Sequence, residues 1–301
     1  MPYIRLGIGP IGWANDDLRG WGPDITGDQI MAEMAATGYS GSEMSYLYPQ
    51  TPEALEDALN EHRLVLAAAY HWTNLTHEGR LDGELRRARE HVDFCADAGA
   101  KFALFAEGGG SLHWDADGPR STIRPFDDAA WARLASALNE LGAHARDRGI
   151  TACVHPHAGT ALERQPEVER LLSLTSPSLV HWCLDTGHAA LAETDTLGMI
   201  RAHANRIRYV HLKDVRADVA QRVRAEKPAF TEAIRWNVFG APGQGSLDFN
   251  AIIGALLEND YEGWLIVEAD QDPNTHPAFD VARNARAFLE EILEKHMVTL
   301  P

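Results

Sequence analysis

Short apolar runs alternate along the chain with longer segments in which apolar residues recur every three or four positions. The short runs are rich in β-branched and aromatic residues and predict eight strands, at residues 4–9, 39–44, 64–70, 101–106, 150–155, 179–184, 207–212 and 264–268. The longer segments have the spacing of amphipathic helices, and predict helices at residues 26–37, 52–62, 82–98, 127–148, 163–174, 195–204, 248–258 and 277–294.

Residues at the segment ends support these boundaries. Thr26 is followed three positions later by Gln29, as in a capping box, and Gly38, Gly99 and Gly149 stand where helices end. Eight strands alternating with eight helices, without a linker rich in Pro, Gly or Ser, predict a single (β/α)8 TIM barrel, an α/β fold, over residues 1–301. A doubly wound sheet with additional helices is the alternative.

Two connections are longer than the others. Residues 108–126 follow the fourth strand and are rich in glycine, and residues 214–245 follow the seventh and are charged. Both leave the carboxyl end of a strand, where TIM barrels form their active sites. We therefore expect these two insertions to border the site.

The charge balance narrows the class of partner. With 27 Lys and Arg against 44 Asp and Glu the net charge is −17, which disfavours nucleic acid and anionic membranes. The start of the chain does not resemble a signal peptide, and no apolar stretch is long enough to cross a bilayer. The three cysteines show no CxxC spacing. We expect a cytoplasmic protein with reduced, buried thiols and a small neutral or cationic ligand.

Polar residues gather where the predicted strands end. Any one of them could simply cap a strand or loop, but strands of a barrel deliver their carboxyl ends to one mouth, so together they predict a site. The residues at these ends are Trp13, Asn15, Asp16, Glu43, His71, Trp72, Glu107, His155, His157, Asp185, His188, His211, Lys213, Asp214, Glu268 and Asp270.

A divalent metal site is the first interpretation of this pattern. Asp185, His211 and Glu268 come from three adjacent strands, and a carboxylate–imidazole set suits Mn²⁺, Co²⁺, Fe²⁺ or Zn²⁺ better than Ca²⁺. A fourth ligand should come from the fifth strand, whose end reads "VHPHAGT". His155 and His157 face the same side there, because alternate residues of an extended chain point the same way. As structural alternatives, Asp185 could cap a helix and Glu268 could form a salt bridge.

Other catalytic motifs are missing from the sequence. It contains no P-loop, no G-x-G-x-x-G that opens a helix after a strand, and no nucleophile elbow. Nucleophilic catalysis is therefore not supported.

Several longer motifs resemble the inosose dehydratase family, within the xylose-isomerase-like TIM-barrel superfamily. They are "GPIGWANDDL", "GYSGSEMSYLYP", "VHPHAGT", "CLDTGH", "HLKDVR", "VFGAPGQGSLDF" and "YEGWLIVEADQDP", and they run nearly from end to end of the chain. The opening "PIGWANDD" and the closing "EADQDP" are far more specific than the metal trio. The resemblance implies a carbon–oxygen lyase that removes water from 2-keto-myo-inositol and gives a trihydroxycyclohexane-dione.

The resemblance also implies roles for the residues at the mouth. Asp185, His211 and Glu268 match three metal ligands, and His155 stands where the superfamily usually has a glutamate. Mn²⁺ or Co²⁺ is the expected ion, with Mg²⁺, Fe²⁺ or Zn²⁺ as alternatives; glutathione is associated with the activity, but no residue here indicates a site for it.

The remaining residues are expected to contact the substrate. Histidine suits proton transfer because its pKa lies near 6.5, so His157 is expected to act as base or acid, with His188 or Lys213 as its counterpart. His157 could instead hold a substrate hydroxyl or occupy the fourth metal position, and Lys213 could instead pair with Asp214 or Glu43. The residues expected to bind the polyol ketone are Trp13, Asn15, Glu43, Trp72 and Glu107.

Two other functions remain open at this point. One is a metal-dependent ketose isomerase or epimerase, and the other is a polyol-binding barrel without turnover. Whether the chain forms a homo-oligomer is also left open.

Overall fold

The computed structural model describes residues 3–22, 24–109 and 123–300, and shows a closed barrel of eight parallel strands. The strand order around the barrel is β1-β10-β7-β6-β5-β4-β3-β2. The strands are β1 (Ile4–Ile8), β2 (Gly41–Glu43), β3 (Val65–Thr73), β4 (Phe102–Glu107), β5 (Thr151–Val154), β6 (Val180–Asp185), β7 (Ile207–Leu212) and β10 (Gly263–Val267). The predicted TIM barrel is confirmed, and the doubly wound alternative is wrong because β1 pairs with both β10 and β2.

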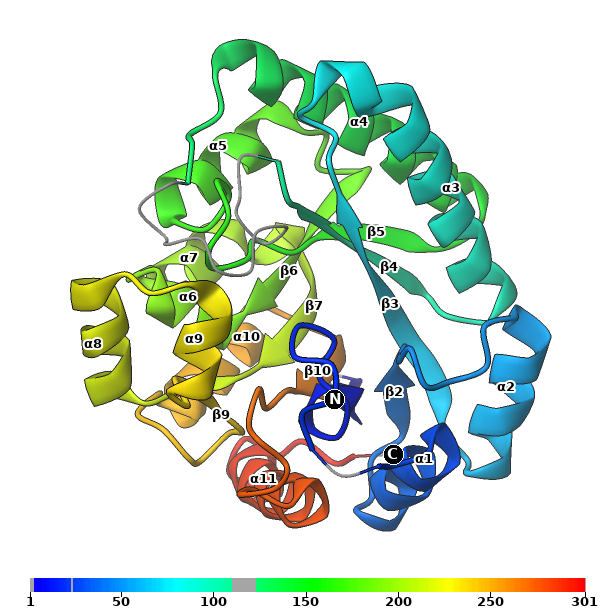
Figure 1. Ribbon diagram of the computed structural model, residues 1–301, viewed down its shortest axis with the longest axis vertical. Helices are drawn as coiled ribbons and strands as arrows, with labels where there is room; N and C mark the ends of the chain where they lie inside the picture. The colour runs from blue at the N-terminus through cyan, green and yellow to red at the C-terminus, as the bar shows by residue number, and fades with distance from the viewer. Residues whose placement is uncertain (1–2, 23, 110–122, 301) are drawn as a thin grey trace.

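Helices surround this barrel in Figure 1. The predicted ones are α1 (Gly27–Ala36), α2 (Pro52–Glu61), α3 (Leu81–Asp97), α4 (Asp128–Asp147), α5 (Gln165–Leu174), α7 (Thr196–His203), α10 (Phe249–Glu258) and α11 (Ala278–Lys295). The capping box predicted at Thr26 is present, with Gln29 Oε1 accepting from the Thr26 backbone N–H. No helix among the described residues is long and apolar enough to cross a membrane.

The structure also contains elements that were not predicted from the sequence. They are the helices α6 (Thr186–Leu191), α8 (Ala217–Glu226) and α9 (Phe230–Arg235), the 3-10 helices η1 (Pro10–Gly12), η2 (Glu78–Arg80) and η4 (Ala204–Arg206), and the antiparallel pair β8 (Asp214–Val215) and β9 (Phe239–Gly240). Most of them are only two to six residues long, too short for a periodic pattern to stand out.

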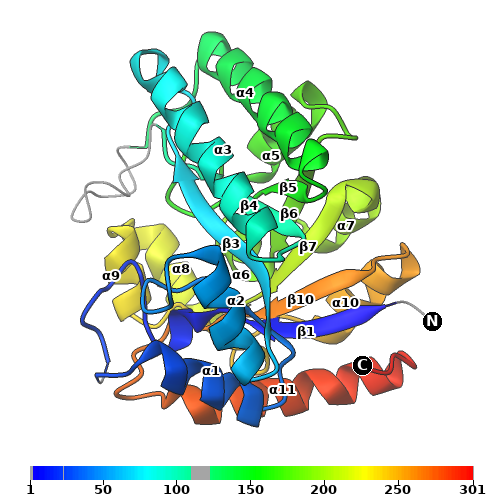
Figure 2. The same ribbon diagram turned by 90° about the vertical axis from the view of Figure 1, so that its right-hand side faces the viewer.

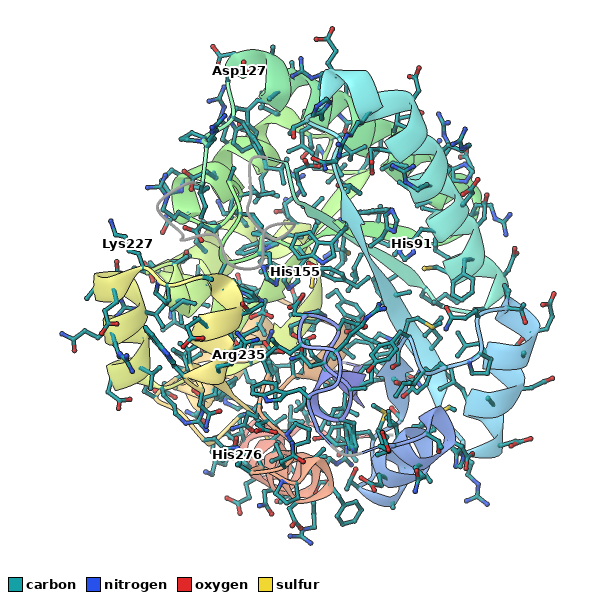
Figure 3. All side chains as sticks on the ribbon, in the orientation of Figure 1. His91, Asp127, His155, Lys227, Arg235 and His276 are labelled. Atoms are coloured by element: carbon teal, nitrogen blue, oxygen red, sulfur yellow. The ribbon has the colours of Figure 1, made fainter. Side chains whose placement is uncertain are left out.

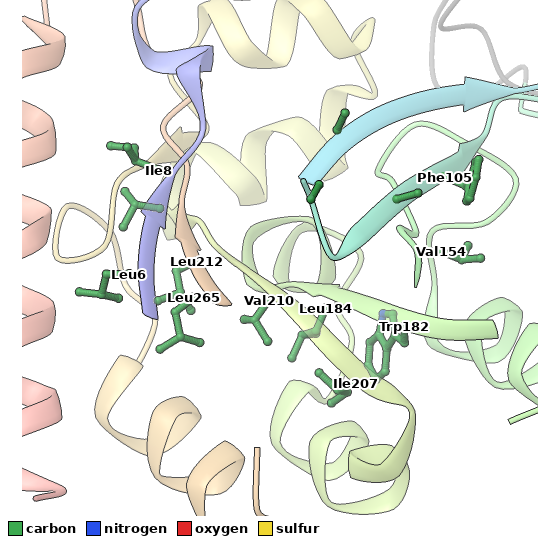
Figure 4. Close-up of a cluster of buried hydrophobic side chains, with 14 of the residues drawn as sticks. Leu6, Ile8, Phe105, Val154, Trp182, Leu184, Ile207, Val210, Leu212 and Leu265 are labelled. Atoms are coloured by element: carbon green, nitrogen blue, oxygen red, sulfur yellow. The ribbon is translucent and has the colours of Figure 1, made fainter. Parts of the chain in front are cut away.

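Successive side chains along each strand point alternately outward and inward, so the core has two parts, one under the helices and one inside the barrel. Side chains that point outward, including Leu6, Val210 and Leu265, pack under the helices, as Figure 4 shows. Side chains that point inward, including Tyr209 and Ile266, fill the barrel. All three cysteines are free and buried, in agreement with the prediction.

Trp264 on β10 fills the floor of the barrel beside β1 and β2, which both carry glycine. A Cβ placed on Gly41 would lie 2.4 Å from Trp264 Cη2, and a Cβ on Gly7 would lie 2.6 Å from Ile266 Cδ1. The Trp264 indole and the Ile266 side chain therefore occupy the space that these glycines leave. This packing closes the barrel below the mouth.

The insertion at 214–245 forms a small unit at the mouth. In Figure 2, β1 runs from the N-terminus at the right toward the left, where α8 and α9 lie. The buried Asp214 carboxylate ties the end of this unit to the barrel, because it accepts from the backbone N–H groups of Gly243, Gly245 and Leu247 at 2.7–3.1 Å. Most of the other long connection, 108–126, lies outside the described residues.

Candidate active site

The inward positions of the strands change from apolar to polar toward the carboxyl ends. On β5 the inward series is Cys153, then His155; on β7 it is Tyr209, then His211, then Lys213. The same two-residue spacing continues the series from Cys183 to Asp185 and from Ile266 to Glu268. Figure 3 places His155 near the middle of the ring of strands. The strand period therefore brings side chains that are far apart in sequence to one layer.

A cavity of about 540 Å³ opens above this layer. Eight of the twelve predicted site residues line it: Glu43, Trp72, His155, His157, His188, His211, Lys213 and Glu268. The other lining residues include Asp17, Tyr46, Tyr70, Phe230 and Asp270. Acidic, basic and aromatic groups thus share one pocket.

Asp185 lies directly beneath the cavity and is fully buried. Its Oδ1 accepts from the backbone N–H of His188 at 2.8 Å and caps α6, which is the structural alternative considered for it. Its Oδ2 has no hydrogen-bond partner and lies 3.5 Å from His155 Nε2 and 3.6 Å from His211 Nδ1. One carboxylate therefore both caps a helix and presents a free oxygen to two histidines.

Four donor atoms are arranged as metal ligands would be. Besides the contacts of Asp185, His211 Nδ1 lies 3.3 Å from Glu268 Oε2, and this Nδ1 is itself buried without a hydrogen-bond partner. Donor atoms that each bind one ion at roughly 2.0–2.2 Å lie roughly 3.0–3.6 Å apart. Asp185 Oδ2 and His211 Nδ1 are buried without hydrogen-bond partners, which is costly unless a ligand binds them, so these side chains fit a divalent ion.

Three groups of described residues have ligand atoms that all lie within 4.8 Å of one another, and together they contain the four predicted ligands. The groups are His155, Asp185 and His188; His155, Cys183 and His211; and Glu43, His211 and Glu268. The contact between Asp185 and His211 also links them. His155 therefore remains the predicted fourth ligand, beside Asp185 and His211.

Three aromatic side chains surround His157. Its ring centre lies 3.9 Å from that of His188, 4.9 Å from Phe230 and 5.0 Å from Trp72. Its Nδ1 lies 2.8 Å from the Ala158 carbonyl oxygen, which can only accept, so Nδ1 carries the proton and Nε2 has the lone pair. His157 is thus held in the tautomer in which Nε2 can take a proton.

His188 faces a hydrogen-bond donor at each ring nitrogen. The Ala158 backbone N–H lies 3.2 Å from Nδ1, and Lys213 Nζ lies 3.3 Å from Nε2. Burial lowers the pKa of His188 well below its ordinary value, so the ring is neutral and has one lone pair, with which it can accept from only one of these two donors.

Lys213 is a buried cation among carboxylates. Its Nζ lies 2.8 Å from Asp270 Oδ2, 3.0 Å from Glu268 Oε2 and 3.6 Å from Asp185 Oδ2. Burial alone would lower the pKa of Lys213, but these carboxylates raise it well above its ordinary value. The ion-pair alternative is therefore real, although the partners are Asp270 and Glu268 rather than Asp214 or Glu43.

Three residues expected to bind substrate lie outside the cavity lining. Trp13 donates its indole N–H to Glu33 at 2.6 Å, and Asn15 Oδ1 accepts from the backbone of Asp17 and Leu18. Glu107 accepts from the hydroxyls of Thr73 and Thr76 and from the backbone N–H groups of Leu75 and Gly109. Each polar group is used to hold a loop, which strand-end position alone did not reveal.

Three groups that line the cavity had no role predicted from the sequence. Asp17 lies one residue beyond the Asn15–Asp16 pair that was considered, and burial raises its pKa to about 6. Asp270 was among the polar strand-end residues that predict the site but was given no role; it follows Glu268 by two residues and so points the same way. Phe230 comes from α9 in the insertion and had no local signal.

Comparison with known proteins places this site in a family. The protein-family model described as xylose isomerase-like TIM barrel matches residues 31–292 of this chain. An inosose dehydratase of Geobacillus kaustophilus (strain HTA426) is 39% identical over 295 residues, covering 96% of this chain and 95% of that relative. The chain belongs to the inosose dehydratase family. Membership makes it an enzyme of the hydro-lyase class, as predicted.

Solved structures agree with the inosose dehydratase family in fold. An L-ribulose 3-epimerase superposes with a TM-score of 0.73 at 19% identity, covering 97% of this chain and 95% of that one. The IOLI protein with a binding zinc atom gives a TM-score of 0.70 at 16% identity, with 97% and 98% covered. At these identities the likeness shows the barrel alone.

Proposed function

We propose that this protein dehydrates 2-keto-myo-inositol to a trihydroxycyclohexane-1,2-dione with the help of a divalent metal ion. The observation that carries the proposal is the cavity, in which the oriented base His157 and the cation Lys213 lie beside two buried donor atoms without hydrogen-bond partners, Asp185 Oδ2 and His211 Nδ1. The reaction is that of the named relatives, and the volume of about 540 Å³ is ample for a six-membered ring.

The metal would be held by His155, Asp185, His211 and Glu268. When bound, it would supply a positive charge that polarises the ketone and makes the α-hydrogen more acidic. The imidazole and carboxylate donors suit Mn²⁺ or Co²⁺ and also Zn²⁺, the ion named for the IOLI structure.

His157 is the proposed base. The Ala158 carbonyl accepts its Nδ1–H, so the lone pair of the neutral ring is on Nε2, the nitrogen to which we assign removal of the α-proton. The neighbouring rings of Trp72, His188 and Phe230 limit how far the imidazole can turn. A general base held in this way typically accelerates the reaction by about 10²–10⁴-fold.

Lys213 is better suited to stabilising negative charge than to giving up a proton. Three carboxylates keep its ammonium charged, so it remains a fixed hydrogen-bond donor near the developing oxyanion. Asp17 is the better acid, because burial leaves it partly protonated near pH 6. We assign to Asp17 the protonation of the departing β-hydroxyl, in place of His188 or Lys213.

The assignment is tested with metal-free protein reloaded with Mn²⁺ or Co²⁺ and incubated with 2-keto-myo-inositol. We expect a dione product, followed by its ultraviolet absorbance, in the loaded protein and none after chelation. Absence of product with either ion would contradict the dehydratase assignment. In deuterated water, an isomerase or epimerase would instead return deuterated substrate and a stereoisomer without loss of water, and a binding protein would retain the ligand unchanged.

A further inference from the structure

Glu43 and His211 form a contact across the mouth of the barrel. Glu43 Oε1 lies 2.9 Å from His211 Nε2, and both side chains are buried, with 7% and 1% of their surface exposed. The two residues are 168 positions apart, on β2 and β7, which are not neighbours in the barrel. The contact therefore exists only because the barrel closes.

The local structure of β2 directs Glu43 toward this contact. The pairing between β2 and β3 shifts by one residue between Ser42 and Glu43, so that Ser42 pairs with Leu66 and Glu43 with Ala68. A bulge of this kind re-aims the side chain that follows it. Glu43 also lines the cavity.

The two nitrogens of His211 face different groups. Nε2 faces Glu43, whereas Nδ1 lies 3.3 Å from Glu268 Oε2 and 3.6 Å from Asp185 Oδ2, two of the proposed ligand atoms. An ionised carboxylate only accepts hydrogen bonds, so the contact with Glu43 requires the proton on Nε2. The lone pair of a neutral His211 is then on Nδ1, the nitrogen on the metal side.

We infer that Glu43 is a positioning residue of the metal centre: its carboxylate accepts the Nε2–H of His211 and so presents Nδ1 to the ion. The inference rests on the proposed metal site and revises the role of Glu43, which was expected to bind substrate. Glu43 is not itself a ligand through this oxygen, because 2.9 Å is a hydrogen-bond distance and leaves no room for an ion between the two atoms. Carboxylates that orient a metal-bound histidine in this way raise metal affinity by about 10–100-fold.

The experiment measures Co²⁺ affinity of the full chain, by competition with a chelating dye, without any substrate. We expect Glu43→Ala to bind Co²⁺ about 10–100-fold more weakly and Glu43→Gln, which keeps an accepting oxygen, to lie between it and the wild type. Asp16→Asn is the matched control: it also removes a carboxylate from the cavity lining, but one that is exposed and paired with Arg19, and it should change affinity less than about threefold.

A second measurement shows the tautomer directly. Nitrogen-15 spectra of the Zn²⁺-loaded wild type should show His211 with its proton on Nε2, and Glu43→Gln should retain the ultraviolet–visible Co²⁺ spectrum of the wild type, because no ligand is lost. A proton on Nδ1, an altered Co²⁺ spectrum in Glu43→Gln, or an unchanged affinity in Glu43→Ala would each overturn the inference. If Glu43→Ala does not fold, the Gln variant and the wild-type spectrum decide. A wild type that binds no Co²⁺ would instead overturn the metal centre itself.

Discussion

Lys213 Nζ lies 2.8 Å from Asp270 Oδ2 in a site where both side chains are 3% exposed. The same ammonium is 3.0 Å from Glu268 and 3.6 Å from Asp185. Removing this cation leaves three buried carboxylates without their partner. Breaking a buried ion pair from one side typically costs about 3–5 kcal/mol.

Lys213→Met should therefore lower the free energy of unfolding of the metal-free protein by about 3 kcal/mol. Urea denaturation measures the change. Lys101→Met is the control, since Lys101 is exposed and should shift stability by less than about 0.5 kcal/mol. Equal stabilities of the two variants would contradict a buried cation at position 213.

The histidines of the site should separate into two kinds. His211→Ala should lose bound metal and activity together, because Nδ1 is one of the unpaired donors. His157→Ala should keep its metal, but its kcat should be about 10²–10⁴-fold lower than that of the wild type. Metal content by elemental analysis and turnover of the same samples test both. Retained turnover in His157→Ala would remove this residue from catalysis.

Asp17→Asn should be more stable than the wild type at high pH but less active. The folded protein raises the pKa of Asp17 to about 6 by burial, so the fold favours its protonated form; the stability from this group is present below about pH 4 and is lost as pH rises through 6. The amide cannot ionise, so the variant should have a higher Tm than the wild type at pH 8 and no such advantage at pH 4.

The kinetic part of the Asp17 prediction concerns the pH profile. In the wild type kcat/KM should fall above about pH 6 as Asp17 loses its proton, and Asp17→Asn should be slower by about 10²–10⁴ without this fall. A variant with wild-type turnover would exclude Asp17 as the acid.

Acid should destabilise the protein through His91, which stacks on His71 with ring centres 5.0 Å apart, outside the site. Burial lowers the pKa of His91 to about 3, so the fold favours the neutral ring, and the stability from it is present above about pH 6.5 and is lost as pH falls toward 3. Between pH 7 and 5 this amounts to about 2 kcal/mol.

His91→Gln can still donate to the Ala69 carbonyl, the present partner of Nε2 at 3.0 Å, but it cannot be protonated. Its loss of stability between pH 7 and 5, measured by urea unfolding at each pH, should be smaller than that of the wild type by about 2 kcal/mol. An identical loss would show that other groups cause the acid sensitivity.

Gly41 should be essential for packing of the barrel floor. Gly41→Ala would place a methyl group 2.4 Å from the Trp264 ring, and it should destabilise the protein by about 1–3 kcal/mol. Gly83→Ala is the opposite case: it lies within α3 with only the Arg87 side chain nearby at 3.7 Å, and alanine there should stabilise by about 0.5–1 kcal/mol. Thermal unfolding of both variants tests the pair.

The sequence by itself determined the barrel, its principal elements and the layer that carries the chemistry. Periodicity is local information, and a period of two fixes that His155, His211 and Glu268 point inward once their strands form. The motifs also determined the family, which the relatives confirm.

Only the tertiary structure decided what each polar group touches. Glu107 and Asn15 stand at strand ends as Glu43 does, but their oxygens are used by nearby backbone and hydroxyl groups, whereas Glu43 reaches His211. Asp270 and Lys213 become partners across two strands. These pairings depend on barrel closure and on the β2 bulge, which set distances between residues far apart in sequence, and no local pattern encodes such distances.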